Sequence, residues 1–110
     1  KIHQTLSEYM VRSKSVVILA NMLTEREVPF WYEKPLFASD GTFYLPDFTI
    51  LMQGEEYYLE HVGRLDLPGY KKHWEKKEAW YQKHFPNKLL TTYETSSLSN
   101  DIDNIIRSLS

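Results

Sequence analysis

The sequence predicts one α/β (α+β) domain over residues 1–110, in which helices flank a mixed β-sheet. Apolar residues first recur at helical spacing, three β-rich segments separated by turns follow, and a second helical segment then leads to a fourth strand. The order α-β-β-β-α-β-α contains hairpins, which are antiparallel, and a β-α-β crossover, whose strands normally run parallel. One domain is expected because 110 residues fall below the ~150 typical of a domain.

The first half of the chain is divided by turn and breaker residues. Val28-Pro29 ends the first helix, and Pro35 restricts the following aromatic strand to a sheet edge or a bulge. Asp40-Gly41 and Gln53-Gly54 are turn sequences that separate this strand from two more, so the three should form an antiparallel meander. The predicted bounds are 13–27 for the helix and 30–37, 42–52 and 56–62 for the strands.

The second half is read from the same signals. Leu67-Pro68-Gly69 begins a helix at Pro68 or Gly69, and Phe85-Pro86-Asn87 ends it at His84. A strand over 88–95 follows, and Asn100 is the predicted N-cap of the last helix. The apolar stripe of that helix consists of Ile102, Ile105, Ile106 and Leu109.

The composition, with 42% hydrophobic, 15% aromatic and 25% charged residues, excludes a disordered, collagen-like or coiled-coil chain. Cysteine is absent, which excludes disulfides and thiolate chemistry. No window approaches the ~18 consecutive apolar residues of a membrane span, and the N-terminus lacks a signal peptide's apolar stretch, so we expect a soluble, cytoplasmic protein. The chain opens with Lys1 rather than Met, as a mature product or a module of a larger protein would, and we expect the module.

Two carboxylates are predicted to face each other across a hairpin. If Gln53-Gly54 is a two-residue loop, Met52 pairs with Glu55 and, counted outward, Asp47 pairs with Glu60. Like charges so placed repel unless a cation lies between them, and a divalent metal ion is the simplest candidate. A three-residue loop would instead put the acids on opposite faces, and an exposed pair at a solvated sheet end is the other alternative.

Lys77 occupies an apolar stripe of the second helix. Tyr70, Trp74, Lys77 and Tyr81 recur at helical spacing, so the lysine should face the sheet. It either snorkels to an edge or is held by carboxylates. Lys72, Lys76 and Lys83 share the outer face of this helix, which is either a solvated surface or a phosphate-binding stripe, and the net charge of −2 does not decide between them. We interpret His61, His73 and His84 as structural, with His61 on the sheet face opposite Glu60.

Several motifs together resemble the PD-(D/E)xK phosphodiesterase superfamily, the restriction-endonuclease-like nucleases, and in particular a branch often appended to helicases or other ATPases. The resemblance extends from about Arg12 to Leu109 and implies a restriction-endonuclease-like α-β-β-β-α-β core. The motifs that carry it are Arg12-Ser13-Lys14-Ser15, Tyr32-Glu33-Lys34-Pro35, Pro46-Asp47-Phe48-Thr49-Ile50, Glu60-His61-Val62-Gly63 and the spacing of Tyr70, Lys77 and Tyr81.

This resemblance implies metal-dependent hydrolysis of a nucleic-acid phosphodiester. Mg²⁺ or Mn²⁺ would be held by Asp47, Glu60 and the backbone carbonyl of His61, because hard cations prefer oxygen ligands. We expect DNA as the substrate, with RNA left open. A helicase or ATPase part of the same chain is an expected partner, and a membrane is not. Nucleic-acid contacts are expected at Lys14, Lys72 and Lys76.

The sequence departs from the family pattern at two positions. The lysine expected two residues after the third-strand acid is replaced by Val62, and Lys77 is the natural substitute as catalytic lysine. A glutamate typical of the first helix is replaced by Val16, which leaves a core residue. The chain is then a weakened nuclease, a natural pseudo-enzyme or an altered form.

Two other functions remain open. One is a catalytically inactive module of the same fold that binds nucleic acid or a protein partner, which Val16 and the negative net charge favour. The other is a structural domain of a larger ATPase, in which Trp31, Trp74 and Trp80 partly serve an interface.

Overall fold

The computed structural model describes residues 2–94 and 97–110, with side chains described from residue 14 onward. The helices and strands follow one another in the order that the sequence predicts, except that two of the predicted strands are each divided. In chain order the elements are α1 (Ile2–Glu25), β1 (Phe30–Tyr32), β2 (Leu36–Phe37), β3 (Phe43–Tyr44), β4 (Phe48–Met52), β5 (Glu55–Val62), α2 (Pro68–His84), β6 (Leu89–Tyr93) and α3 (Leu98–Leu109).

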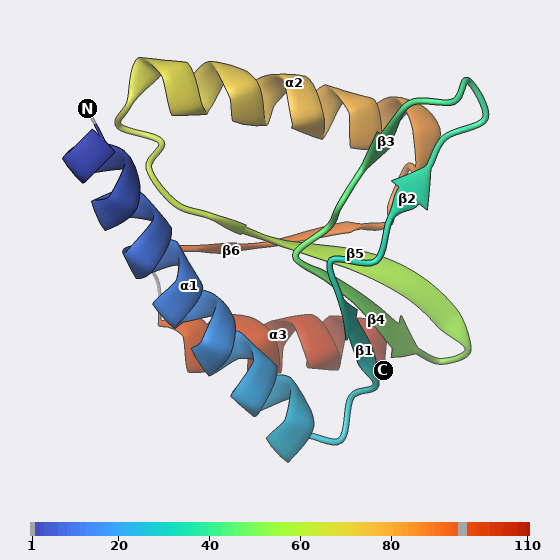
Figure 1. Cartoon of the computed structure of the whole chain (residues 1–110). Helices are drawn as coiled ribbons and strands as arrows, with labels where there is room; N and C mark the ends of the chain where they lie inside the picture. The colour runs from blue at the N-terminus through green and yellow to red at the C-terminus, as the bar shows by residue number, and fades with distance from the viewer. Residues whose placement is uncertain (1, 95–96) are drawn as a thin grey trace.

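The elements form three layers around a four-stranded sheet with the strand order β1-β4-β5-β6. The helix α2 lies on one side of this sheet, and α1 and α3 lie on the other (Figure 1). The strands β1, β4 and β5 are antiparallel neighbours, whereas β5 and β6 run parallel. The predicted α+β architecture, with a mixed sheet flanked by helices, is therefore confirmed.

Two of the predicted strands are each broken in the structure. The segment 30–37 is divided into β1 and β2, and the segment 42–52 into β3 and β4. Pro35 and Pro46 lie at these breaks, and each lacks the N–H that a continuous ladder needs. The strands β2 and β3 pair as a separate two-stranded sheet, and their connection contains the predicted turn at Gly41, where φ is +88°.

The hairpin between β4 and β5 has the predicted register. Gln53 and Gly54 both have positive φ, +52° and +76°, as a two-residue turn of type I′ requires. Met52 consequently pairs with Glu55, and the same register continues to the pair of Phe48 and Leu59. The alternative of a three-residue loop is excluded.

The predicted helix bounds hold for α2 and differ at the other two helices. The helix α1 begins at Ile2 rather than Ser13, because no proline or glycine interrupts the residues before it. The N-cap of α3 is Ser97, so the prediction of Asn100 is wrong and that residue lies in the first turn. The strand β6 ends at Tyr93, and the predicted end at residue 95 lies outside the described residues.

The hydrophobic core lies between the sheet and the layer of α1 and α3. Val16, Leu19 and Leu23 of α1 pack there with Phe48 of β4 and Leu59 of β5, each less than a tenth exposed. Full burial of one such side chain contributes about 1.5 to 3 kcal/mol, so this layer holds α1 against the sheet. The predicted apolar stripe of α3 also belongs to this core: Ile102, Ile105, Ile106 and Leu109.

None of the helices in the described part of the chain is long and apolar enough to span a membrane.

Candidate active site

Asp47 and Glu60 are buried where the β4–β5 ladder ends. Asp47 immediately precedes β4 and is 2% exposed, and Glu60 lies within β5 and is 1% exposed. The register that pairs Phe48 with Leu59 places these two acids opposite each other one step further along. Burial raises the pKa of Glu60, and the nearby charge of Asp47 adds to the rise.

Glu60 is held by two side chains of α2. The hydroxyl of Tyr81 donates a hydrogen bond to Oε2 of Glu60 at 2.6 Å, and Nζ of Lys77 lies 2.9 Å from the same oxygen. Burial raises the pKa of Glu60 above its ordinary value, Asp47 adds to the rise, and Lys77 and Tyr81 oppose it. Lys77 therefore does not snorkel to solvent, since its side chain is only 15% exposed.

A small hairpin closes one side of this arrangement. The ammonium of Lys77 lies 5.4 Å from the centre of the Tyr44 ring in β3. Tyr44 packs against Trp80 of α2 with ring centres 4.8 Å apart, and the Trp80 indole donates a hydrogen bond to Oγ1 of Thr42 at 2.8 Å. The β2–β3 hairpin is thereby fixed to α2, and Lys77 is confined between the hairpin and Glu60.

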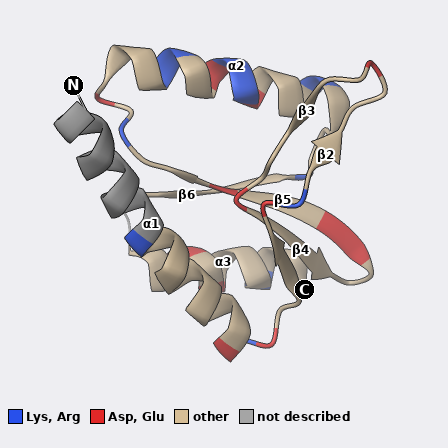
Figure 2. Cartoon of the chain, viewed as in Figure 1, with Lys and Arg blue, Asp and Glu red and all other residues tan. Residues whose placement is uncertain are grey.

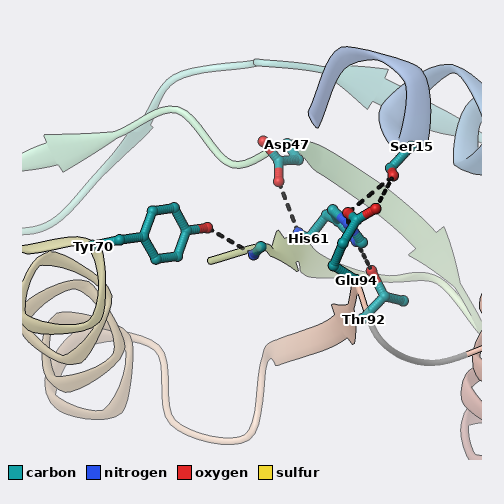
Figure 3. Close-up of polar contacts among 7 residues, drawn as sticks. Ser15, Asp47, His61, Tyr70, Thr92 and Glu94 are labelled. Carbon is teal, nitrogen blue, oxygen red and sulfur yellow. Dashed lines mark hydrogen bonds and ion pairs between the residues drawn. The ribbon is translucent and has the colours of Figure 1, made fainter. Parts of the chain in front are cut away.

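Asp47 also binds the backbone of β5. Its Oδ2 accepts a hydrogen bond from the N–H of His61 at 2.8 Å (Figure 3). The carboxylate is therefore anchored to the peptide group that follows Glu60. The resemblance assigns the carbonyl of this same residue, His61, as a metal ligand, so the three expected ligands belong to residues that adjoin one another in the sheet.

The imidazole of His61 belongs to a different network, which the sequence did not reveal. Its Nδ1 lies 2.9 Å from Oγ1 of Thr92 and its Nε2 lies 2.6 Å from Oε1 of Glu94. Ser15 of α1 donates a hydrogen bond to the same carboxylate at 3.1 Å (Figure 3). Because α1 and α2 lie on opposite sides of the sheet, this ring faces away from Glu60, as predicted. No local pattern links Ser15 with Glu94, so only the folded chain brings them together.

A cavity of about 190 Å³ opens beside Glu60 and is lined by residues of β5 and α2. The Tyr70 hydroxyl at its wall accepts a hydrogen bond from the N–H of Gly63 at 2.9 Å. His73, which we interpreted as structural, lies on this wall one helical turn before Lys77, so the structure adds it to the residues around the site. The lining residues are Glu60, His61, Tyr70, His73, Trp74 and Lys77.

The donor atoms at this point suit a hard divalent cation. Among the residues that the structure describes, no group of three or more His, Cys, Asp or Glu side chains forms a metal site. Mg²⁺, however, is commonly bound through one or two carboxylates and keeps several water ligands. Two interacting buried carboxylates and the adjoining carbonyl of His61 meet that requirement with oxygen atoms alone.

The three lysines expected at nucleic acid are exposed but do not form one surface. Lys72 and Lys76 lie on α2, where basic residues alternate with acidic ones (Figure 2). Lys14 lies on α1, which covers the other side of the sheet. A ligand that follows α2 contacts Lys72 and Lys76, and Lys14 would have to act from a separate place.

The remaining sequence hypotheses concern Val16 and the tryptophans. Val16 is 7% exposed in the core between α1 and the sheet, as a residue of an inward stripe should be. Trp74 is buried and Trp80 is partly buried against Tyr44, whereas Trp31 is 43% exposed.

Comparison with protein-family models, with curated proteins and with solved structures finds no match for this chain. A function must therefore be inferred from its own residues and their geometry.

Proposed function

We propose that this chain is a metal-dependent nuclease of the PD-(D/E)xK superfamily that hydrolyses phosphodiester bonds of DNA. The observation that carries the proposal is the contact of Lys77 with Glu60, beside Asp47. It supplies an amine at the carboxylate pair although the usual lysine position is Val62, which is buried at 1% exposure. Two acids and one lysine are the groups that this reaction uses, and Glu60 and Lys77 of this set also line the cavity.

Each residue has a role that follows from its contacts. Asp47, Glu60 and the carbonyl of His61 would hold Mg²⁺ or Mn²⁺, which supplies an acidified water and neutralises charge on the phosphate. Tyr81 fixes the Glu60 carboxylate by its hydrogen bond, so that Glu60 keeps one orientation. Lys77 would orient the attacking water or stabilise charge on the phosphate, since its ammonium is held beside Glu60 and away from bulk solvent.

The nucleic acid would reach this site along α2. Lys72 and Lys76 are exposed on that helix and can contact backbone phosphates, which gives affinity without sequence preference. Lys14 is the proposed contact from α1. DNA is the proposed substrate, the cytoplasm the proposed compartment, and an ATPase or helicase region of a longer chain the proposed partner.

A paired measurement of metal binding and cleavage tests this function. Titration with Mn²⁺ should raise the melting temperature of the chain, because a ligand that binds only the native state stabilises it. Asp47→Asn should abolish the rise and also the cleavage of a DNA substrate. Asp66→Asn is the matched control, because Asp66 is an exposed acid paired with Arg64 away from the carboxylate pair. A parent chain with no Mn²⁺-dependent stabilisation at millimolar concentration contradicts the metal site.

An inactive nucleic-acid-binding module is the second candidate, and Val16 favours it. The first-helix glutamate typical of the branch is replaced by a residue that completes the core, so no third carboxylate enters from α1 at this position. In that case the chain should bind DNA and Lys72→Ala should weaken binding, while no cleavage accompanies either Mg²⁺ or Mn²⁺. The cleavage assay separates the two candidates directly.

A further inference from the structure

The cavity beside Glu60 is bounded on one side by a single face of α2. The lining residues of this helix recur at helical spacing, so their side chains project from the same side of it. They are Tyr70, His73, Trp74 and Lys77. The cavity volume of about 190 Å³ is large enough for several water molecules, and therefore for a polar ligand of similar size.

Hydrogen-bond donors on this face of α2 are available to such a ligand. The hydroxyl oxygen of Tyr70 accepts from the N–H of Gly63 at 2.9 Å (Figure 3), and no described residue accepts the hydroxyl hydrogen. An ammonium has three N–H groups, and Glu60 takes one of those of Lys77. The imidazole of His73 makes no hydrogen bond or ion pair with any other residue that the structure describes, and an imidazole carries an N–H in either protonation state.

The carboxylate in the cavity lining is already satisfied. Oε2 of Glu60 lies 2.9 Å from the ammonium of Lys77 and accepts from the hydroxyl of Tyr81 at 2.6 Å. The ammonium therefore offsets the charge of Glu60. A ligand that matches the remaining donors must supply acceptor oxygens. A phosphate group does so, because each of its oxygens accepts charge-assisted hydrogen bonds.

We propose that Tyr70 and His73 form, together with Lys77, a subsite that binds a phosphate group of the nucleic acid. The inference rests on the proposed function for the source of the phosphate, whereas the subsite itself depends only on the available donors. The lining does not include Asp47, so the bound phosphate is a neighbour of the one at the carboxylate pair. Lys76 is exposed and lies three positions after His73, so a strand that follows α2 can contact both residues.

Binding of thymidine 5′-monophosphate to the metal-free chain tests the subsite. The imidazole signals of His73 in NMR spectra should move when this nucleotide or inorganic phosphate is added, and not when thymidine is added, because thymidine has no phosphate. His84 is the internal reference, since its ring lies beside Asp40 at the other end of α2. His73→Ala should weaken nucleotide binding by about 10-fold, the loss expected for one hydrogen bond to a charged group. His73→Gln keeps an N–H donor and should bind more tightly than the alanine variant.

A single-stranded DNA oligonucleotide tests whether the phosphate belongs to nucleic acid. His73→Ala should weaken metal-free binding of this oligonucleotide. In cleavage at saturating Mg²⁺, it should raise KM by about 10-fold with little change in kcat, because a neighbouring phosphate is held equally before and during the reaction. The melting temperature should stay unchanged, since His73 is exposed. Gln82→Ala is the matched control, because Gln82 is an exposed, uncharged residue of the same helix that does not line the cavity.

The possible outcomes separate this inference from the proposed function. Unchanged nucleotide affinity in His73→Ala overturns the subsite, even where the parent binds Mn²⁺ and cleaves DNA. Phosphate binding that depends on His73 without any effect on DNA binding overturns the assignment to nucleic acid, because the ligand is then free phosphate. A parent that binds the nucleotide through His73 but neither binds Mn²⁺ nor cleaves DNA overturns the nuclease and leaves the subsite.

Discussion

Nζ of Lys77 lies 2.9 Å from Oε2 of Glu60, an ion pair between the helix α2 and the strand β5. Tyr81 donates to the same oxygen from one turn further along α2, so the helix presents two donors to one carboxylate. A buried ion pair is weak evidence for stability, because desolvation offsets much of its attraction. Its location beside Asp47 makes a chemical role the better explanation, and the variants below separate that role from packing.

Lys77→Met should remove catalysis and spare the fold. Methionine keeps the length and helix propensity of lysine, and the Glu60 carboxyl left without its partner can retain a proton because burial already raises its pKa, so the chain should still fold. Cleavage of one DNA substrate at saturating Mg²⁺ should fall by about 10² to 10⁴-fold, the contribution of a positioned acid-base group. Lys71→Met, on an exposed position of the same helix, should cleave at the parent rate. Equal rates for Lys77→Met and the parent would exclude Lys77 as the catalytic lysine.

Val16→Glu should destabilise the metal-free chain and test whether the missing glutamate limits activity. It places a carboxylate in the core beside Leu19 and Leu23, which should lower the free energy of unfolding by about 3 kcal/mol or more. Val17→Glu is the matched control, because Val17 is the next residue along the helix and is 58% exposed. If position 16 can reach the metal, Mn²⁺ should bind more tightly and cleavage should rise. Destabilisation without tighter Mn²⁺ binding or faster cleavage means that this face of α1 only packs in the hydrophobic core.

Glu60 should make the metal-free protein less stable as the pH rises. Its pKa is raised by burial, so the native state retains this proton at pH values where the unfolded chain has released it. The contribution of Glu60 to the free energy of unfolding is therefore fully present below the ordinary carboxyl range, about pH 4 to 5. It is lost as the pH rises through the raised pKa of the folded state. Glu60→Gln cannot ionise, and its urea midpoint should decline less than that of the parent over the same interval. Parallel pH dependences for the two chains would contradict the raised pKa.

Glu94 should stabilise the fold through His61 and Ser15. Glu94→Ala removes the partner of Nε2 in a completely buried imidazole, which should cost about 1 to 3 kcal/mol. Glu94→Gln keeps an oxygen acceptor and should cost less. In urea denaturation, Ser15→Ala should lower stability in the parent and have little further effect in the Glu94→Ala background, because its hydroxyl donates to that carboxylate. Additive losses would show that the two residues act independently.

The sequence by itself determined the order of elements and the register of the central hairpin. Gln53-Gly54 allows positive φ at both turn positions, and one two-residue loop sets which residues of β4 and β5 face each other. Counting outward from this turn along the two strands pairs Asp47 with Glu60. Helical spacing in α2 likewise predicts that Lys77 faces the sheet, because residues three or four positions apart lie on the same face of a helix. These features depend on neighbours in sequence, so local chemistry suffices to predict them.

Only the tertiary structure decided which partners those residues meet. Whether Lys77 snorkels or pairs depends on where α2 crosses β5, and Ser15, His61 and Glu94 meet because α1, β5 and β6 pack together. The strand breaks at Pro35 and Pro46 also depend on the tertiary structure, because a proline interrupts a strand only where the neighbouring strand would need an N–H donor at that position. Contacts between distant segments follow from the packing of all layers at once, and no spacing within a single segment encodes them.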